Sequence, residues 1–422
     1  MSKRGIAALL ASGVLAAATL TACGSDGGNG SGDNSGGGGK TIDMAVTQSA
    51  DSEIRATLTD MAASFKEETG ITVNLLPASN QYESDMKVRM GANDLPDIFA
   101  THGWSVKRYK DFLVPLDGEE WASNFNSMLD DAMRDADGHF YALPLELDTT
   151  GVLYNRDVFE QAGVDAATVK TWADFEAAAQ KITDAGVTAV FAGGKNRYYP
   201  GNVANLMAPG FYSDADLQAL LDGTFPAEPW NAITTKIQGW QKSGFFNPDF
   251  VSATDDDMSR ALAEGKTGMV LAQNSIAANA LTYNPDANLG YFPVPNDSGD
   301  AYLMGGEGVN SFGVAKDGEV EEAKQFIAYM AKPENAAKLT KGTGNPSGLT
   351  NVTADLGPLQ SSYDAAVDAG TPLVSYFDRV YLPNGMWGPM CDAIAELIAG
   401  TGTPETSLRT MQDNFSSLFG AE

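Results

Sequence analysis

Between residues 41 and 100, segments whose hydrophobic residues have the spacing of a β-strand alternate with segments whose hydrophobic residues have the spacing of a helix. Residues 41–46 follow the two-residue period of a β-strand, and residues 71–75 and 96–100 are further strand candidates. Between them, apolar residues at helical spacing predict one helix over about 52–70 and another over about 83–90. This succession of strand, helix, strand, helix and strand is typical of an α/β unit with a parallel sheet.

The same pattern restarts in the second half of the chain. Thr171 and Asp174 form a capping-box pattern, which predicts a helix that begins at Trp172 and ends at Gly186. Further strands are expected at residues 187–191 and 266–271. From about residue 319 onward the pattern is mostly helical, and it includes an apolar helical stripe around Cys391.

The length of the body predicts more than one domain. About 380 ordered residues exceed what one hydrophobic core usually serves, so we expect two α/β lobes. Beyond residue 40 no Gly/Ser-rich linker separates them. The chain should therefore pass between the lobes through ordered segments that act as a hinge.

The first 40 residues have a different character. Lys3 and Arg4 precede an uncharged run from Gly5 to Leu20, as in a secretory signal, and the run is shorter than a membrane span. Leu20-Thr21-Ala22-Cys23 resembles a bacterial lipobox, which predicts a signal peptide over 1–22 and acyl chains on Cys23. The alternative is an ordinary signal with an incidental cysteine. Residues 23–40 are then the lipidated cysteine and a flexible tether, since 24–39 contain only Gly, Ser, Asp and Asn.

Charge and residue counts exclude several classes of protein. The chain has 27 Lys or Arg and 55 Asp or Glu, a formal net charge of −28, which argues against nucleic-acid partners and against side-chain docking on anionic lipid. Two cysteines and two histidines are too few for a zinc site, and no HExxH, GxSxG or Walker A motif occurs. Cys391 is expected to be a small buried hydrophobe without a disulfide partner. Residues 255–257 are interpreted as a solvated acidic loop rather than a Ca²⁺ site.

Several segments, in the same order along residues 41–422, resemble the extracellular solute-binding proteins of ABC importers. The resemblance is to the large carbohydrate-binding family typified by maltodextrin-binding protein. The segments that carry it include Phe65-Lys66-Glu67-Glu68-Thr69-Gly70, Leu95-Pro96-Asp97-Ile98-Phe99, Tyr141-Ala142-Leu143-Pro144, Trp172-Ala173-Asp174-Phe175, Gly265-Lys266-Thr267-Gly268-Met269, Tyr291-Phe292-Pro293-Val294-Pro295, Gly305-Gly306 and Pro333-Glu334-Asn335-Ala336-Ala337. Gly268 stands where the family usually has Ala.

This resemblance implies a periplasmic-binding-protein-like fold of two lobes, each a central sheet flanked by helices. The first lobe would comprise 41–147 and about 302–350, and the second 148–301 and about 351–422. A mono- or oligosaccharide would bind between the lobes, which would then close and dock on a membrane permease. The protein would be a monomer, lipid-anchored on the extracellular face of the bacterial membrane, with no cofactor, no metal and no catalytic role.

A sugar presents an apolar C–H face and a rim of hydroxyls, which favour aromatic rings and charged or amide side chains. Trp387 opens the helix where the family often places a stacking aromatic, and His102 and Trp104 follow the third strand at its carboxyl end. Asp148 aligns with the family's crossing carboxylate, and Glu146 shares its face of the extended chain. The remaining candidates lie at a second crossing or in loops that follow strands: Gly306, Glu307, Asn274, Arg197, Tyr199, Gln48 and Ser49. The family's Trp near Asn274 is absent, and Ser275 takes its place.

Two other functions remain open at this point. An anchored glycoside hydrolase needs two carboxylates about 5–9.5 Å apart, and 55 acidic residues could supply such a pair. A binding protein for a polyamine or a peptide would use the same fold, and a cationic cargo would suit Asp148 and Glu307. The ordered family pattern argues against the enzyme, and the many aromatic residues favour a sugar.

Overall fold

Two lobes with separate sheets make up the body of the protein, in agreement with the predicted α/β class. The computed structural model describes residues 40–48, 52–79, 81–195, 197–341 and 343–420. The first lobe contains a five-stranded sheet in the order β2-β1-β3-β11-β4, in which β1 pairs in parallel with β2 and β3. Its strands are β1 (Thr41–Ala45), β2 (Thr72–Leu75), β3 (Ile98–Ala100), β4 (Ala142–Pro144) and β11 (Ser311–Val314).

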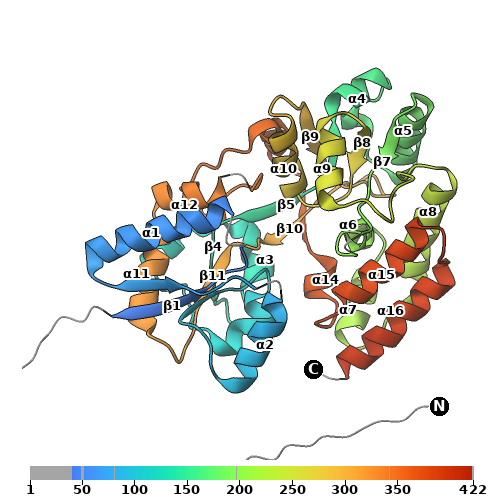
Figure 1. The fold of residues 1–422 in the computed structure, drawn as a ribbon. Coiled ribbons are helices and arrows are strands. Elements are labelled where there is room, and N and C mark those ends of the chain that lie inside the picture. Colours follow the sequence, from blue (N-terminus) through green and yellow to red (C-terminus); the bar gives the residue numbers. More distant parts are fainter. Residues whose placement is uncertain (1–39, 49–51, 80, 196, 342, 421–422) are drawn as a thin grey trace, which may run out of the picture. The chain divides into compact units, whose positions relative to one another are not determined.

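Helices α1, α11 and α12 lie together against this sheet (Figure 1). The first-lobe helices are α1 (Glu53–Thr69), α2 (Tyr82–Ala92), α3 (Asp130–Met133), α11 (Val320–Met330) and α12 (Pro333–Thr340). The predicted limits of α1 are confirmed: Ser52 caps it by accepting from the Arg55 N–H, and Gly70 ends it at φ 77°. A one-turn π-helix, η1 (Ser105–Tyr109), follows β3.

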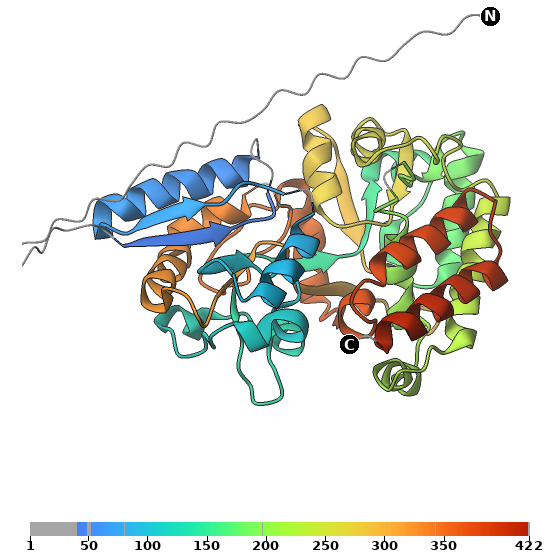
Figure 2. The same cartoon turned by 60° about the horizontal axis from the view of Figure 1, so that its bottom comes forward.

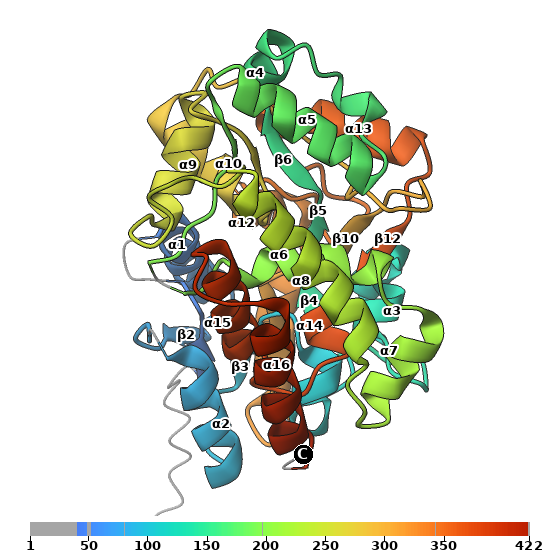
Figure 3. The same ribbon diagram turned by 90° about the vertical axis from the view of Figure 1, so that its right-hand side faces the viewer.

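The second lobe contains a four-stranded sheet in the order β7-β8-β6-β9. Its strands are β6 (Val152–Asn155), β7 (Thr188–Val190), β8 (Thr267–Val270) and β9 (Leu289–Phe292). The helices between residues 156 and 283 are α4 (Arg156–Gln161), α5 (Trp172–Asp184), α6 (Gly201–Met207), α7 (Asp214–Leu221), α8 (Ala227–Lys242), α9 (Asp255–Ala263) and α10 (Ser275–Tyr283). The helices after residue 359 are α13 (Gln360–Asp368), α14 (Phe377–Val380), α15 (Trp387–Ile398) and α16 (Pro404–Phe419). Helices α6, α8, α15 and α16 pack together (Figure 3).

Sequence predictions for this lobe are mostly confirmed. The Thr171–Asp174 capping box begins α5, and Cys391 is buried within α15. The acidic loop predicted at residues 255–257 is wrong, because these residues form the first turn of α9. Thr254 and Asp257 make a capping box, and acidic side chains at a helix N-terminus are favoured by its positive end.

A third, small sheet joins the two lobes. It has the order β12-β10-β5, with β5 (Leu147–Thr150), β10 (Leu303–Glu307) and β12 (Leu373–Ser375). Strands β5 and β10 run antiparallel between the lobes, with Gly306 opposite Asp148 and Glu307 opposite Leu147 (Figures 1 and 2). The main chains approach closely, since a Cβ on Gly305 would lie 2.3 Å from the Asp148 carbonyl oxygen.

Glu146 is buried beside this crossing and its carboxylate is held by amides. Oε1 accepts from the backbone N–H and the side-chain Nδ2 of Asn310, at 3.1 and 2.9 Å, and Oε2 accepts from Asn345 Nδ2 at 3.4 Å. Burial, reinforced by the negative charge of Asp148, nevertheless raises the pKa of Glu146 to about 7. The crossing therefore holds a carboxyl group that titrates near neutral pH.

The glycine that replaces the family's usual alanine in β8 has a packing reason. A Cβ on Gly268 would lie 2.7 Å from Ile182 Cδ1 of α5. We expect Gly268→Ala to destabilise the protein by about 1–3 kcal/mol, as overpacking does. Ile182→Val removes the clashing methyl group, so urea unfolding should show that the alanine costs less in an Ile182→Val background. An equal cost in both backgrounds would contradict this packing account.

The raised pKa of Glu146 predicts a particular pH dependence. Between about pH 4.5 and pH 7 the folded protein retains a proton that the unfolded chain has lost, so stability falls as pH rises through this window. Glu146→Gln removes the titration. We expect its unfolding free energy, relative to wild type, to rise with pH across the window by up to about 1.4 kcal/mol per pH unit. A difference that is constant from pH 4.5 to pH 8, measured by urea unfolding, would show that Glu146 titrates normally.

Candidate functional site

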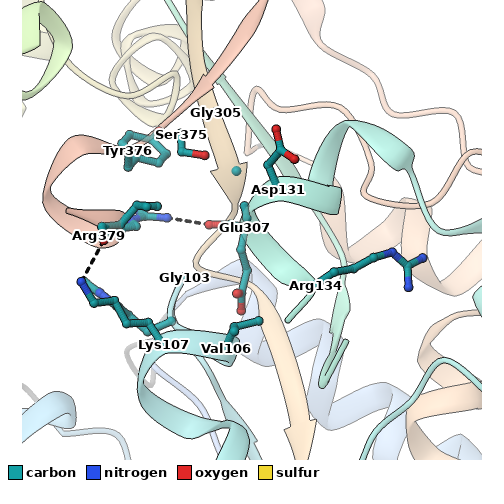
Figure 4. Close-up of a pocket in the computed structure, with 14 residues that line it drawn as sticks. Gly103, Val106, Lys107, Asp131, Arg134, Gly305, Glu307, Ser375, Tyr376 and Arg379 are labelled. Atoms are coloured by element: carbon teal, nitrogen blue, oxygen red, sulfur yellow. Dashed lines mark hydrogen bonds between the residues drawn. The ribbon is translucent and has the colours of Figure 1, made fainter. Parts of the chain in front are cut away.

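A pocket lies where the loop after β3 meets strand β10 and helix α14 (Figure 4). It encloses about 560 Å³ of empty space, including its open mouth. Both lobes line it: Gly103, Trp104, Val106, Lys107, Asp131, Ala132, Arg134, Gly305, Gly306, Glu307, Ser375, Tyr376, Arg379 and Val380. Carboxyl ends of strands in open α/β sheets are the usual place for ligands, which makes this pocket the candidate site.

The first-lobe wall of the pocket is a strained loop. His102 has φ 51° and Gly103 has φ 86°, and a positive φ is uncommon for a residue with a side chain. His102 Nδ1 lies 2.5 Å from Glu83 Oε1 of α2. Burial, assisted by the positive charge of Arg379, lowers the pKa of His102 to about 4, so the ring is neutral at pH 7. Its Nδ1–H then donates to Glu83 and fixes the loop.

Trp104 provides an aromatic surface at this wall. The guanidinium of Arg108 lies 4.3 Å from the Trp104 ring centroid and forms an ion pair with Glu83. His102 meets the Trp104 ring edge to face at 5.6 Å. The tryptophan is thus braced by charged and aromatic neighbours, as a flat platform for a sugar requires.

Glu307 lies at the end of β10 with its carboxylate turned toward the first lobe. One oxygen accepts from the Thr101 hydroxyl, and the other accepts from the Ser105 N–H at 3.0 Å and from the Ser105 hydroxyl. The carboxylate therefore caps the π-helix η1. The main-chain carbonyl of Glu307 faces the second lobe and accepts from Arg379 Nη1 at 2.6 Å (Figure 4).

Asp148 lies beneath the pocket on β5. Its Oδ1 accepts from Asn345 Nδ2 at 2.9 Å, and its Oδ2 is 3.8 Å from Arg379 Nη2. Burial raises the pKa of Asp148, and the Arg379 guanidinium partly offsets the effect. Asn345 also accepts from Asn274 Nδ2 at 3.2 Å, which links the crossing to the start of α10.

These groups form a continuous polar band across the crossing. Gln48 Nε2 donates to Asn310 Oδ1, Asn310 donates to Glu146, and Asn345 connects Glu146, Asp148 and Asn274. Next to Asn274, Gln273 Nε2 donates to Asn202 Oδ1 of α6 at 2.7 Å. The band thus runs from the first lobe to the second.

Several buried polar atoms along this band have no hydrogen-bond partner among the described residues. Those of the band are Gln48 Oε1, Asn202 Nδ2 and Asn274 Oδ1, and Trp387 Nε1 on the neighbouring helix α15 is unpartnered too. Buried polar groups are normally satisfied, so such atoms indicate places where a ligand or water binds. A Cβ on Gly201, the neighbour of Asn202, would lie 3.4 Å from Trp387 Cη2, so α6 packs closely against the start of α15.

Trp387 is half-buried at the start of α15 and belongs to an aromatic group of the second lobe. Its ring lies 5.9 Å from that of Tyr198, which in turn lies 5.4 Å from that of Tyr199. Arg197 has φ 50° and pairs with Asp392 of α15 at 2.8 Å. Tyr198 is exposed, so this group presents an aromatic surface to solvent.

The structure places the sequence-predicted residues in two groups. The first group is at the pocket and the crossing: Trp104, Gly306 and Glu307 line the pocket, His102 precedes the lining residue Gly103, and Asp148, Glu146, Asn274 and Gln48 lie along the polar band. The second group is the second-lobe aromatic group, which contains Trp387, Arg197 and Tyr199. Ser49 and Cys23 lie outside the described residues. Sequence reasoning missed Arg379, Tyr376, Asn202, Asn310 and Asn345. The short segment Gly344-Asn345-Pro346 is a turn signal, but no pattern marks the others.

The described part of the chain lacks two other kinds of feature. Among these residues no group of three or more His, Cys, Asp or Glu side chains has the geometry of a metal site. The helices that the structure describes include none with the length and apolar character of a membrane span.

Known proteins resemble this chain over most of its length. Residues 60–369 match the family of bacterial extracellular solute-binding proteins. MelE of Bacillus subtilis, a melibiose/raffinose/stachyose-binding protein, is 32% identical over 376 residues, and the match covers 87% of each chain.

Solved structures agree with this match. A binding protein of Bacillus subtilis named msmE, in an open conformation, has a TM-score of 0.82 at 29% identity, covering 91% of this chain and 98% of its own. A sugar transporter of Bacillus licheniformis in complex with stachyose has a TM-score of 0.79 at 29% identity, covering 90% of this chain and 100% of its own. The chain therefore belongs to the family of bacterial extracellular solute-binding proteins.

Proposed function

We propose that this protein captures an oligosaccharide for an ABC importer, and that the sugar carries an α-galactosyl unit, as melibiose, raffinose and stachyose do. The observation that carries the proposal is the combination of the pocket, which the rings of Trp104 and Tyr376 line, with the band of amide and carboxylate groups that crosses between the lobes. Its donors and acceptors match a rim of hydroxyls, and its rings match the C–H face of a pyranose. The relatives that bind melibiose, raffinose and stachyose support the class of sugar.

We assign the ligand contacts to the predicted residues that face the pocket or end the band, together with Arg379, Tyr376 and Asn202. Asp148, Glu146 and Glu307 contribute by positioning their neighbours, because their oxygens already accept from protein N–H and O–H groups. The lobes would divide as the sequence predicts, at about residues 147, 302 and 350. Binding would favour the closed arrangement by the ligand's differential affinity for it.

We infer that the protein performs no reaction on the sugar. The three buried carboxylates of the crossing are tied to protein donors, whereas a glycoside hydrolase needs two that face the scissile bond. Of the two carboxylates that line the pocket, Glu307 is engaged by protein donors and Asp131 is exposed, and a single exposed negative charge does not match the several ammonium groups of a polyamine. The family match and the named sugar-binding relatives support a binding role.

We further propose that the protein acts as a monomer, held on the extracellular face of the membrane by acyl chains on Cys23. Lipobox residues 20–23 and the Gly/Ser-rich tether support this anchor. The sugar-loaded protein would deliver its cargo to ABC permease subunits.

A thermal-shift panel tests the proposed ligand. We expect raffinose, stachyose and melibiose to raise the melting temperature, because ligand that binds only the folded state stabilises it once its concentration exceeds Kd. Isomaltose is the matched control, since it differs from melibiose at C4 of the terminal sugar. Stabilisation by spermidine or a peptide, but by no sugar, would show that the ligand is a polyamine or a peptide. Release of nitrophenol from a nitrophenyl α-galactoside would show that the protein is an enzyme.

Calorimetry on variants tests the residues. Asn202→Ala and Trp387→Ala should each weaken binding of the stabilising sugar by about tenfold or more, through loss of a hydrogen bond or of a stacking surface. Asn279→Ala is the control, because Asn279 donates to Asp256 on the surface of the second lobe. Wild-type affinity in both test variants, with unchanged melting temperatures, would remove these residues from the site.

Substitution of the lipobox cysteine tests the anchor. In a bacterial host, Cys23→Ser should move the protein from the membrane fraction to the medium or periplasm and abolish labelling by radioactive palmitate. Cys391→Ser is the matched control and should remain in the membrane fraction, since Cys391 is buried in α15. Acylation of Cys23 would be refuted if the Cys23→Ser variant stayed in the membrane fraction and the wild-type protein took up no radioactive palmitate.

A further inference from the structure

Arg379 is a second-lobe residue whose side chain reaches the first lobe. It belongs to the short helix α14, whose neighbours Phe377 and Leu382 are part of the second-lobe core. Its guanidinium contacts the loop after β3, where a Cβ on Gly103 would lie 2.4 Å from Nη1, and it lies 5.5 Å from the Trp104 ring centroid. One side chain thus spans the gap between the lobes.

The same guanidinium is tied to both crossing strands. Nη1 donates to the Glu307 carbonyl of β10 at 2.6 Å, and Nη2 is 3.8 Å from Asp148 Oδ2 of β5. Its planar face lies 4.1 Å from the Tyr376 ring centroid. The side chain is only 13% exposed, so these partners compensate for most of its lost hydration.

Neighbouring bonds join the same two segments. Lys107 Nζ donates to the Val380 and Leu382 carbonyls at 2.8 and 3.2 Å, and Arg108 donates to Asn384. Residues 103–108 of the first lobe therefore meet residues 379–384 of the second. Figure 4 shows Lys107 directed toward the segment that carries Arg379, and Arg379 directed toward Glu307.

We propose that Arg379 is the residue that couples occupancy of the pocket to the position of the lobes. A sugar in the pocket touches the guanidinium. The remaining N–H groups of the guanidinium hold β5 and β10, and its edge fits against Gly103. Movement of α14 with the second lobe then shifts the guanidinium against Trp104, so the ligand gains its full set of contacts in only one lobe arrangement. This inference rests on the proposed sugar-binding function.

A lysine cannot replace Arg379 in this role. The forked guanidinium engages a carbonyl, a carboxylate and two ring faces at once, whereas an ammonium group is a compact point charge. Arg134 provides a matched control. It lines the same pocket, but its contacts are Asp130, the Gly138 carbonyl and the rings of Phe125 and Phe140, all in the first lobe.

The test compares Arg379→Lys, Arg379→Met and Arg134→Met by calorimetry and by small-angle scattering, with the sugar that most stabilises wild type. Both Arg379 variants should lose about tenfold or more in affinity. They should also fail to show the change in radius of gyration that the sugar causes in wild type. Both variants should melt below wild type without sugar, Arg379→Met more so, because Asp148 loses its buried cationic partner. Arg134→Met should retain the change in radius.

A second variant displaces the guanidinium without removing it. Gly103→Ala places a methyl group where Arg379 Nη1 lies, so it should weaken binding as Arg379→Met does. The double variant Gly103→Ala/Arg379→Met should bind the sugar no more weakly than whichever single variant has the lower affinity. The reason is that both changes break the same contact, between Gly103 and the Arg379 guanidinium. Additive losses, or closure by Arg379→Met at saturating sugar, would overturn the coupling role. If wild type binds no sugar at all, it is the proposed function that fails.

Discussion

Burial of three carboxylates at the crossing strands is the constraint on which the rest of the structure depends. Moving an ion out of water costs several kcal/mol, so Glu146, Asp148 and Glu307 each require fixed donors. Those donors come from different parts of the chain: Asn310, Asn345, Thr101, Ser105 and Arg379. Satisfying the carboxylates therefore fixes the loop after β3, the turn before β11, the segment after α12 and helix α14 around one small sheet.

This constraint also determines which groups remain for a ligand. The carboxylate oxygens are used inside the protein, and the side chains that face outward are their neighbours: the Arg379 guanidinium, the amides at the ends of the band and the aromatic rings. A hydroxyl both donates and accepts, so it can use the donors and the acceptors among these groups, whereas an ammonium ion can use only the amide oxygens and the aromatic faces. The arrangement thus favours a neutral polyol over a cation at the same crossing.

The sequence predicted the fold better than the site, for physical reasons. Hydrophobic periodicity, helix caps and turns depend only on residues close together in the sequence. The limits of α1 and α5 could therefore be predicted from Ser52, Gly70 and Thr171. The first turn of α9 was missed because three consecutive aspartates look like a solvated loop until Thr254 is recognised as their cap. Arg379 and Asn345 gave no signal, because their shared partner Asp148 is more than 190 residues away in the sequence. His102 and Trp104 could be proposed from the sequence because the end of a strand is a local feature.

The two lobes contribute different parts of the proposed site, and this division has a thermodynamic consequence. Gln48 and Trp104 belong to the first lobe, and Asn202, Trp387 and Arg379 belong to the second. No one lobe offers both the aromatic platform at Trp104 and the unpartnered amide nitrogen of Asn202. Affinity measured in solution must then include the free-energy cost of bringing the lobes into the arrangement in which both contact the ligand. Any substitution that changes this cost changes the affinity, even when the substituted residue does not touch the ligand. The crossing carboxylates limit that cost, because they hold both strands in one register whether or not a ligand is bound.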